Sequence, residues 1–119
     1  RDAPPPIVPV AYPAVDPARF IQRGVLTVDL HTRHFLMENR SIPLPPSTFD
    51  YLVTLMRHSP DVVSFETLVK EAQGYSVSRS EAREMVRWQI HEIRKVLEPD
   101  PRHPRYIIMV RDVGYRLVV

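Results

Sequence analysis

The segment RYIIMVRDVGYRLVV, residues 105–119, decides the fold of this chain. Two β-rich runs, 105–110 and 115–119, flank the short connection Arg111-Asp112-Val113-Gly114. Because glycine tolerates a positive φ, we expect Gly114 to supply the permissive backbone that a hairpin turn needs. The sequence therefore predicts a β-hairpin at the C-terminal end.

Two amphipathic helices are predicted in the middle of the chain. In the first, apolar residues recur at spacings of three and four over residues 49–56. Ser47 is its expected N-cap, with Asp50 three residues on as in a capping box, and the segment His58-Ser59-Pro60 ends it. The second helix follows Ser64, another expected N-cap, and stops at Gly74.

A third, longer helix is predicted from about Ser80 to Leu97, ended by Pro99. Val86, Ile90, Ile93 and Leu97 repeat at spacings of four, three and four, which indicates a buried stripe. At about 100° per residue, the opposite side carries the residues Glu81, Glu84, Trp88 and Lys95, and one flank carries Arg83, Arg87, His91 and Arg94.

The N-terminal part divides into a linker and a small sheet. Residues 1–19 are rich in proline, which removes backbone donors, so we predict an interdomain linker there and one folded domain over 20–119. Alternating apolar residues over 25–30 indicate a strand, and 34–37 and 41–44 are expected as two more, with a tight turn at Glu38-Asn39-Arg40. These strands form an antiparallel sheet.

The order of elements is a sheet, three helices and a hairpin, which predicts an α+β fold of the winged helix-turn-helix type. In that layout the third helix enters the major groove of DNA and the hairpin, or wing, reaches the backbone or the minor groove.

Charge is unevenly distributed along the chain. The net charge is +2, but residues 1–76 carry a net of −1 and residues 77–119 a net of +3, mostly from arginine. Arginine suits fork-like contacts with phosphate, so the C-terminal part is the better candidate for a polyanionic partner. No apolar run is long enough for a membrane span, and we expect a cytoplasmic location and no membrane partner.

Four motifs resemble the C-terminal domains of OmpR/PhoB-type response regulators. They are LPPSTFDYL at 44–52, VVSFETL at 62–68, IHEIRKVLE at 90–98 and RDVGYRL at 111–117. The resemblance implies a four-stranded N-terminal sheet, three helices and a wing, which act as the DNA-binding output domain of a two-component system. It also implies an upstream receiver domain, a homodimer on direct DNA repeats, and a loop from Gln73 to Arg79 that touches RNA polymerase.

The resemblance and the helix geometry together give a set of expected DNA contacts, on the third helix and the wing: Arg79, Arg83, Arg87, Trp88, His91, Arg94, Lys95, Arg111 and Tyr115. Arg111 at the hairpin tip is expected in the minor groove, where the negative potential is strongest. Three residues depart from the family pattern. Glu92 stands where a base-reading arginine is common, Trp88 replaces a small residue, and Asp112 replaces a wing glycine.

These departures leave a second interpretation open. A protein-interaction module on the same scaffold would use Trp88 with Glu81, Glu84 and Glu92 as its contact patch. The electrostatic potential over the outward face of the third helix separates the two, since a positive face favours DNA and a neutral or acidic one favours protein.

Catalysis is not expected. The chain lacks cysteine, and none of its five histidines has the spacing of metal ligands. With only three glycines it has no phosphate-binding loop, and no nucleophile motif occurs. The sequence predicts neither a cofactor nor a metal.

Overall fold

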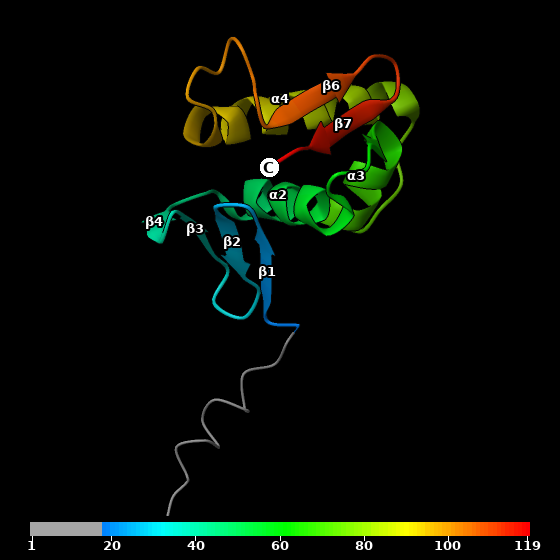
Figure 1. Ribbon diagram of the computed structural model, residues 1–119. Coiled ribbons are helices and arrows are strands. Elements are labelled where there is room, and N and C mark those ends of the chain that lie inside the picture. Colours follow the sequence, from blue (N-terminus) through cyan, green and yellow to red (C-terminus); the bar gives the residue numbers. More distant parts are fainter. Residues whose placement is uncertain (1–17) are drawn as a thin grey trace, which may run out of the picture.

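The computed structural model describes residues 18–119, so most of the predicted linker, residues 1–17, lies outside the described residues. A four-stranded sheet comes first, followed by three helices and a hairpin, with the hairpin lying along the longest helix (Figure 1). The elements are β1 Phe20–Arg23, β2 Leu26–Asp29, β3 His34–Met37, β4 Arg40–Ile42, α2 Pro46–His58, β5 Val63–Ser64, α3 Phe65–Gln73, α4 Arg79–Leu97, β6 Ile107–Val110 and β7 Gly114–Leu117. The α+β winged-helix prediction is confirmed.

The N-terminal sheet is antiparallel in the order β1-β2-β3-β4. Its register aligns Val28 with Phe35, and both side chains are buried. Between β3 and β4, Glu38 and Asn39 both take positive φ, as a two-residue hairpin turn requires, so the predicted turn is confirmed. Apolar alternation indicated three strands here; β1 was implied only by the resemblance, because its side chains are at most half-buried and give little periodic signal.

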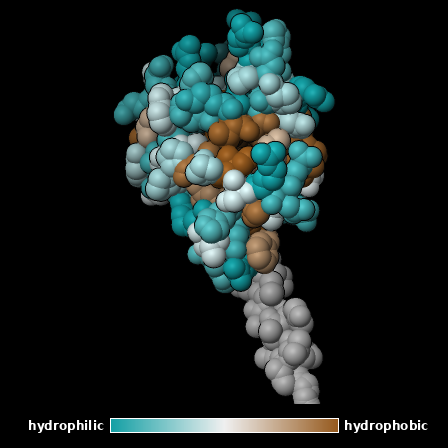
Figure 2. All heavy atoms as spheres, turned by 90° about the vertical axis from the view of Figure 1, so that its left-hand side faces the viewer, coloured by the Kyte–Doolittle hydropathy of each residue, from teal (hydrophilic) through white to brown (hydrophobic). Residues whose placement is uncertain are grey.

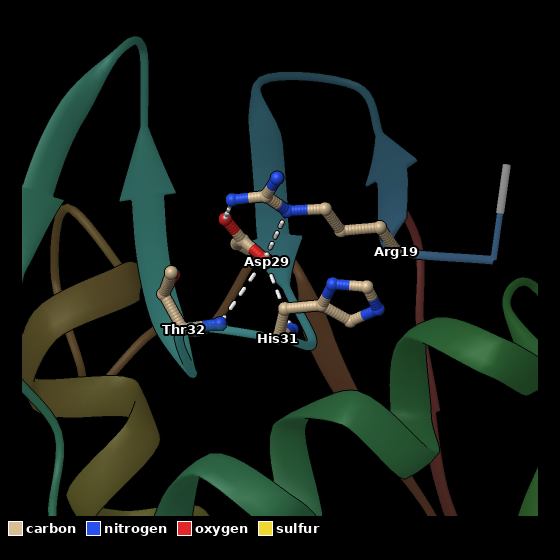
Figure 3. Close-up of polar contacts among 4 residues, drawn as sticks. All are labelled: Arg19, Asp29, His31 and Thr32. Atoms are coloured by element: carbon tan, nitrogen blue, oxygen red, sulfur yellow. Dashed lines mark hydrogen bonds and ion pairs between the residues drawn. The ribbon is translucent and has the colours of Figure 1, made fainter. Parts of the chain in front are cut away.

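Asp29, at the end of β2, attaches Arg19 to the sheet (Figure 3). Arg19 Nε donates to Oδ1 at 3.0 Å and Nη2 to Oδ2 at 2.8 Å. The same Oδ1 accepts the backbone N–H groups of His31 and Thr32 at 3.0 and 3.2 Å. These donors hold the pKa of the Asp29 carboxyl well below its usual range, with the arginine contact as the largest cause. Arg19, which we predicted to end the linker, is thus bound to the folded domain.

The predicted start of the first helix is wrong by two residues. Pro45 is the N-cap and Pro46 the first helical residue, because proline has the fixed φ of a helix and lacks an N–H that would go unpaired. Ser47 therefore lies inside the first turn, where its Oγ accepts Gln89 Nε2 from α4 at 3.2 Å. The expected capping box does not form, and Asp50 instead pairs with Arg33 at 2.9 Å.

The other two helix starts follow the sequence closely. Ser64 caps α3 by accepting the N–H of Thr67, and Gly74 ends that helix with φ 85°, so both predictions are confirmed. The third helix, α4, begins at Arg79 rather than Ser80, because Ser78 is the N-cap and accepts the N–H of Glu81 at 3.2 Å. The stripe predicted to be buried is confirmed: Val86, Ile90, Ile93 and Leu97.

The wing is confirmed, but the role predicted for Gly114 is wrong. The positive φ at the turn belongs to Asp112, at 62°. Gly114 is the first residue of β7, and its partner across the sheet is Ser64 of β5. An added Cβ at this position would overlap the carbonyl oxygen of Val63. Glycine is needed because the wing passes directly against the chain that leads into α3.

Glu98 joins the end of α4 to the start of the wing. It is only 6% exposed. Its Oε1 accepts the N–H of Arg105 at 2.7 Å and its Oε2 that of Ile107 at 2.8 Å, while Tyr106 N–H lies 3.1 Å from both oxygens. One carboxylate thus satisfies three consecutive amides, which would otherwise lack partners beside a buried strand end.

Apolar surface is limited on the face shown in Figure 2. Apolar side chains gather near the middle of that face, and hydrophilic side chains surround them.

Over residues 18–119, none of the helices combines the length and apolar character that a membrane crossing demands.

Replacing Glu98 tests the link between α4 and the wing. In Glu98→Gln an amide donor faces backbone N–H groups, so we expect the free energy of unfolding to fall by about 1–3 kcal/mol. Urea denaturation followed by circular dichroism measures it. Glu84→Gln, an exposed substitution on the same helix, is the control and should leave the midpoint unchanged; equal midpoints for both variants would contradict the proposed role of Glu98.

The Asp29 contacts predict a dependence of stability on pH. Because the pKa of Asp29 is lower in the folded than in the unfolded chain, its contribution is present above the ordinary aspartate pKa of about 4 and is lost as the pH falls. Asp29→Asn should therefore lower stability at neutral pH and flatten its decline in acid. Urea midpoints at pH values from about 7 to 2 test this; parallel curves for the two proteins would rule it out.

Candidate nucleic-acid interface

The outward side of α4 and the tip of the wing form one surface, which we call the α4–wing face. Most of this face consists of exposed side chains of α4, and they lie on the side of the helix that the sequence predicted to be exposed. Arg83, Arg87 and His91 are exposed one after another at spacings of four, so they form a row along the helix. Arg79, in the first turn, is exposed as well, and Lys95 is exposed near the C-terminal end. The wing tip adds Arg111, whose side chain is 91% exposed.

A groove runs between α4 and the wing. It has a volume of about 610 Å³ and is lined by Glu84, Arg87, Trp88, His91, Arg94, Pro101, Met109 and Tyr115. Trp88 is 56% exposed and Met109 51%, and because both line this groove they form an apolar patch of the kind that marks a binding surface. Five of the nine expected contact residues line this groove.

Met109 is a residue of this face that sequence reasoning missed. It lies two residues after the buried Ile107 on β6, so both side chains are on the same face of the strand. Ile107 contacts the core, while Met109 lies farther along the wing and lines the groove. The two-residue spacing from Ile107 already placed Met109 on the same face of the strand. The sequence did not show, however, where along that strand the buried core ends.

Arg94 and Tyr115 are less available than the rest of the expected set. Arg94 Nη2 donates to the Ile107 carbonyl at 2.8 Å, and its guanidinium carbon lies 5.6 Å from the centre of the Tyr115 ring. Tyr115 is buried and meets Phe65 edge to face at 6.0 Å. These contacts hold the wing against α4 and α3. Both residues therefore support the α4–wing face from within the protein.

The wing-tip carboxylate lies between two arginines. Asp112 Oδ1 is 3.8 Å from Arg83 Nη1, and Oδ2 is 4.0 Å from Arg111 Nε. All three side chains are more than half exposed, so these ion pairs are weak and salt-sensitive. Asp112 nevertheless lowers the positive charge at the point where the wing meets α4.

The acidic residues on α4 are partly neutralised within the helix. Glu92 pairs with Lys95 at 3.0 Å, and its side chain is only 21% exposed. Glu81 accepts a hydrogen bond from the Ser78 hydroxyl at the N-cap, where a carboxylate is favoured by the helix dipole. Glu84 remains exposed in the groove. Arg83 and Arg87, which we call the arginine row, are both exposed, whereas Glu81 and Glu92 are engaged by neighbouring groups.

No group of three or more metal-ligating side chains occurs in the described part of the chain, residues 18–119. The α4–wing face gathers basic side chains, aromatic rings and a methionine, with the carboxylates of Glu84 and Asp112 exposed among them. That combination suits binding of a polyanion with apolar features.

Comparison with known proteins identifies the family. The family model described as "Transcriptional regulatory protein, C terminal" matches residues 39–117. The DNA-binding response regulator MtrA of Mycolicibacterium smegmatis is 29% identical over 101 residues, which are 85% of this chain and 43% of MtrA. The chain thus spans less than half the length of the curated relatives it matches. Motif resemblance had predicted the same family.

Solved structures agree with this assignment. The Thermotoga maritima response regulator DrrB, an OmpR/PhoB homologue, is 29% identical with a TM-score of 0.68, over 85% of this chain and 45% of DrrB. The Klebsiella pneumoniae RstA DNA-binding domain, in complex with the RstA box, is 25% identical with a TM-score of 0.62, over 83% of this chain and 96% of that domain. The chain therefore belongs to the transcriptional regulatory protein C-terminal family, the winged-helix output domains of OmpR/PhoB-type response regulators, which are transcription factors and not enzymes.

Proposed function

We propose that this chain binds double-stranded DNA in a sequence-specific way and regulates transcription, with α4 in the major groove and the wing in the minor groove. The observation that carries the proposal is the row of exposed basic side chains Arg83, Arg87 and His91 beside the exposed Arg111 of the wing tip. The crystal structure of the related RstA domain in complex with its box supports it.

The residues of the face take different roles in this proposal. Arg83 and Arg87 on one flank of α4, and Lys95 near its C-terminal end, contact phosphates, because exposed cations of a recognition helix meet the DNA backbone that borders the groove. Arg111 enters the minor groove. Arg79 and His91 add contacts at the helix start and in its middle. Arg94 and Tyr115 act through the position of the wing, since their contacts within the protein already occupy them.

The local charge balance favours DNA over a protein-interaction module. Glu92 is engaged by Lys95 and Glu81 by the N-cap, so two of the three carboxylates of the alternative patch are tied to neighbouring groups. Within residues 18–119 the arginines of the row have one charged partner, Asp112 at the wing tip, which lies 3.8 Å from Arg83. An outward face with exposed arginines and mostly paired carboxylates attracts phosphate.

The chain corresponds to less than half of its curated relatives, so the remaining roles are proposals about a longer protein. We propose that an upstream receiver domain controls this domain, that two copies bind direct repeats as a homodimer, and that the loop from Gln73 to Arg79 contacts RNA polymerase. Gly74, Tyr75 and Ser76 in that loop are exposed, as such a contact requires. We also propose a cytoplasmic location, since the domain must reach DNA.

Arginine substitutions test the phosphate contacts. Using a duplex selected from random oligonucleotides, we expect Arg87→Ala to weaken binding across sequences and to reduce the slope of log K against log salt by about 1. Arg111→Ala should also weaken binding. Fluorescence anisotropy at several salt concentrations measures both. Arg40→Ala, on the N-terminal sheet, is the matched control. Enrichment of no duplex even at low salt would refute the proposal, as would equal slopes for Arg87→Ala and Arg40→Ala.

Removing the charge of Asp112 should strengthen DNA binding, whereas the arginine substitutions should weaken it. Asp112→Asn removes one negative charge beside Arg83 and Arg111, and asparagine tolerates the positive φ of this position. We expect affinity for the selected duplex to rise about twofold to fivefold at low salt and less at high salt. Unchanged or weaker binding at low salt, with an unchanged urea midpoint, would contradict this.

A further inference from the structure

Trp88 is the largest exposed apolar side chain of the α4–wing face, and it has no polar or aromatic partner among residues 18–119. Trp88 projects from the side of α4 opposite the buried stripe and is 56% exposed. Within residues 18–119 its ring takes part in no hydrogen bond, ring stacking or cation–π contact, whereas Phe65 and Tyr115 have such partners. A side chain of this size, left uncovered among cations, points to an apolar feature of the ligand.

The chemistry around Trp88 limits what that feature is. Indole has one donor, Nε1–H, and no acceptor, so it reads hydrogen-bonding edges poorly. Its surface is chiefly apolar and is extended by Met109 across the groove. In the major groove of DNA, the thymine C5 methyl is the apolar group that the base edges present.

The position of Trp88 on α4 fits such a contact. It lies in the middle of α4, which runs from Arg79 to Leu97, on the side opposite the buried stripe and next to the flank that carries Arg87 and His91. If the basic residues of that flank approach one DNA phosphate backbone, the residue on the outermost line of the helix lies over the base edges. Trp88 is then the central side chain of the inserted helix.

We propose that Trp88 is a specificity-determining residue that reads thymine through its C5 methyl group, so that the recognised site contains an A·T pair opposite the middle of α4. This inference rests on the proposed DNA binding and deepens it. It gives a direct role to one of the departures from the family pattern: a large apolar side chain replaces a small one and closes over a methyl group.

Single-atom changes in the DNA test this proposal. The duplex selected with the whole 119-residue chain is resynthesised with deoxyuridine in place of each thymine in turn, which removes only the C5 methyl. We expect one or two positions at which the wild-type chain binds about fourfold more weakly, the value expected for one buried methyl group. The other thymines should be replaceable without effect.

The variant Trp88→Ala completes the experiment. It should bind thymine and deoxyuridine duplexes equally at those positions, and its urea midpoint should equal that of the wild type because the side chain is exposed. Tyr75→Ala, which removes an exposed aromatic ring outside the groove, is the matched control and should keep the wild-type preference.

The outcomes separate this inference from the proposed function. If the selection enriches no duplex, DNA binding itself fails. If a duplex is bound but no thymine is sensitive, or if Trp88→Ala keeps the same sensitivity, thymine reading is overturned while DNA binding stands. If Trp88→Ala leaves the affinity unchanged as well, the groove lies outside the DNA contact, and a protein ligand becomes the occupant to seek.

Discussion

The geometry of the binding face depends on the buried carboxylate of Glu98. It follows directly after α4 and accepts three consecutive N–H groups at the start of the wing. A hairpin packed on a helix by apolar contacts alone can slide or tilt, whereas directed hydrogen bonds at the joint fix both its angle and its register. Arg94 adds a second directed link, from α4 to the Ile107 carbonyl. These links fix where the hairpin turn that carries Arg111 and Asp112 lies relative to Arg83.

The end of the wing near its turn is fixed by close packing of two backbone segments, and not by a charged side chain. Gly114 lies against the backbone of Val63 and Ser64, at a distance that leaves no room for a Cβ. The wing is thus tied to the segment before α3 at one end and to the end of α4 at the other. Since α3 and α4 form the helix-turn-helix, the two ties make that motif and the wing move as one unit, which suits a surface that must match both grooves of one duplex.

The surface itself combines features that usually oppose each other in DNA binding. Exposed arginines attract the phosphate backbone of DNA. Asp112 and Glu84 reduce this attraction, and Trp88 adds apolar area to the face. Strong uniform positive charge raises affinity for every sequence equally, because phosphate contacts carry no sequence information. A face with fewer free charges and a large apolar reader in the centre gives less affinity for arbitrary DNA and more for sites with the right base edges. The departures from the family pattern are consistent with a shift in that direction.

The sequence alone determined the element order, the helix stripe and the family, because these depend on local periodicity, capping residues and short motifs. Ser64 and Gly74 work as predicted since an N-cap and a left-handed C-cap involve only neighbouring residues. Tertiary structure decided what depends on distant partners. Ser47 became a partner of Gln89 on α4, and Gly114 was required by the approach of Val63. The same holds for the site. Exposure on one helix face follows from sequence, but only packing against the wing showed that Arg94 and Tyr115 are engaged within the protein and that Trp88 has no polar or aromatic partner among residues 18–119.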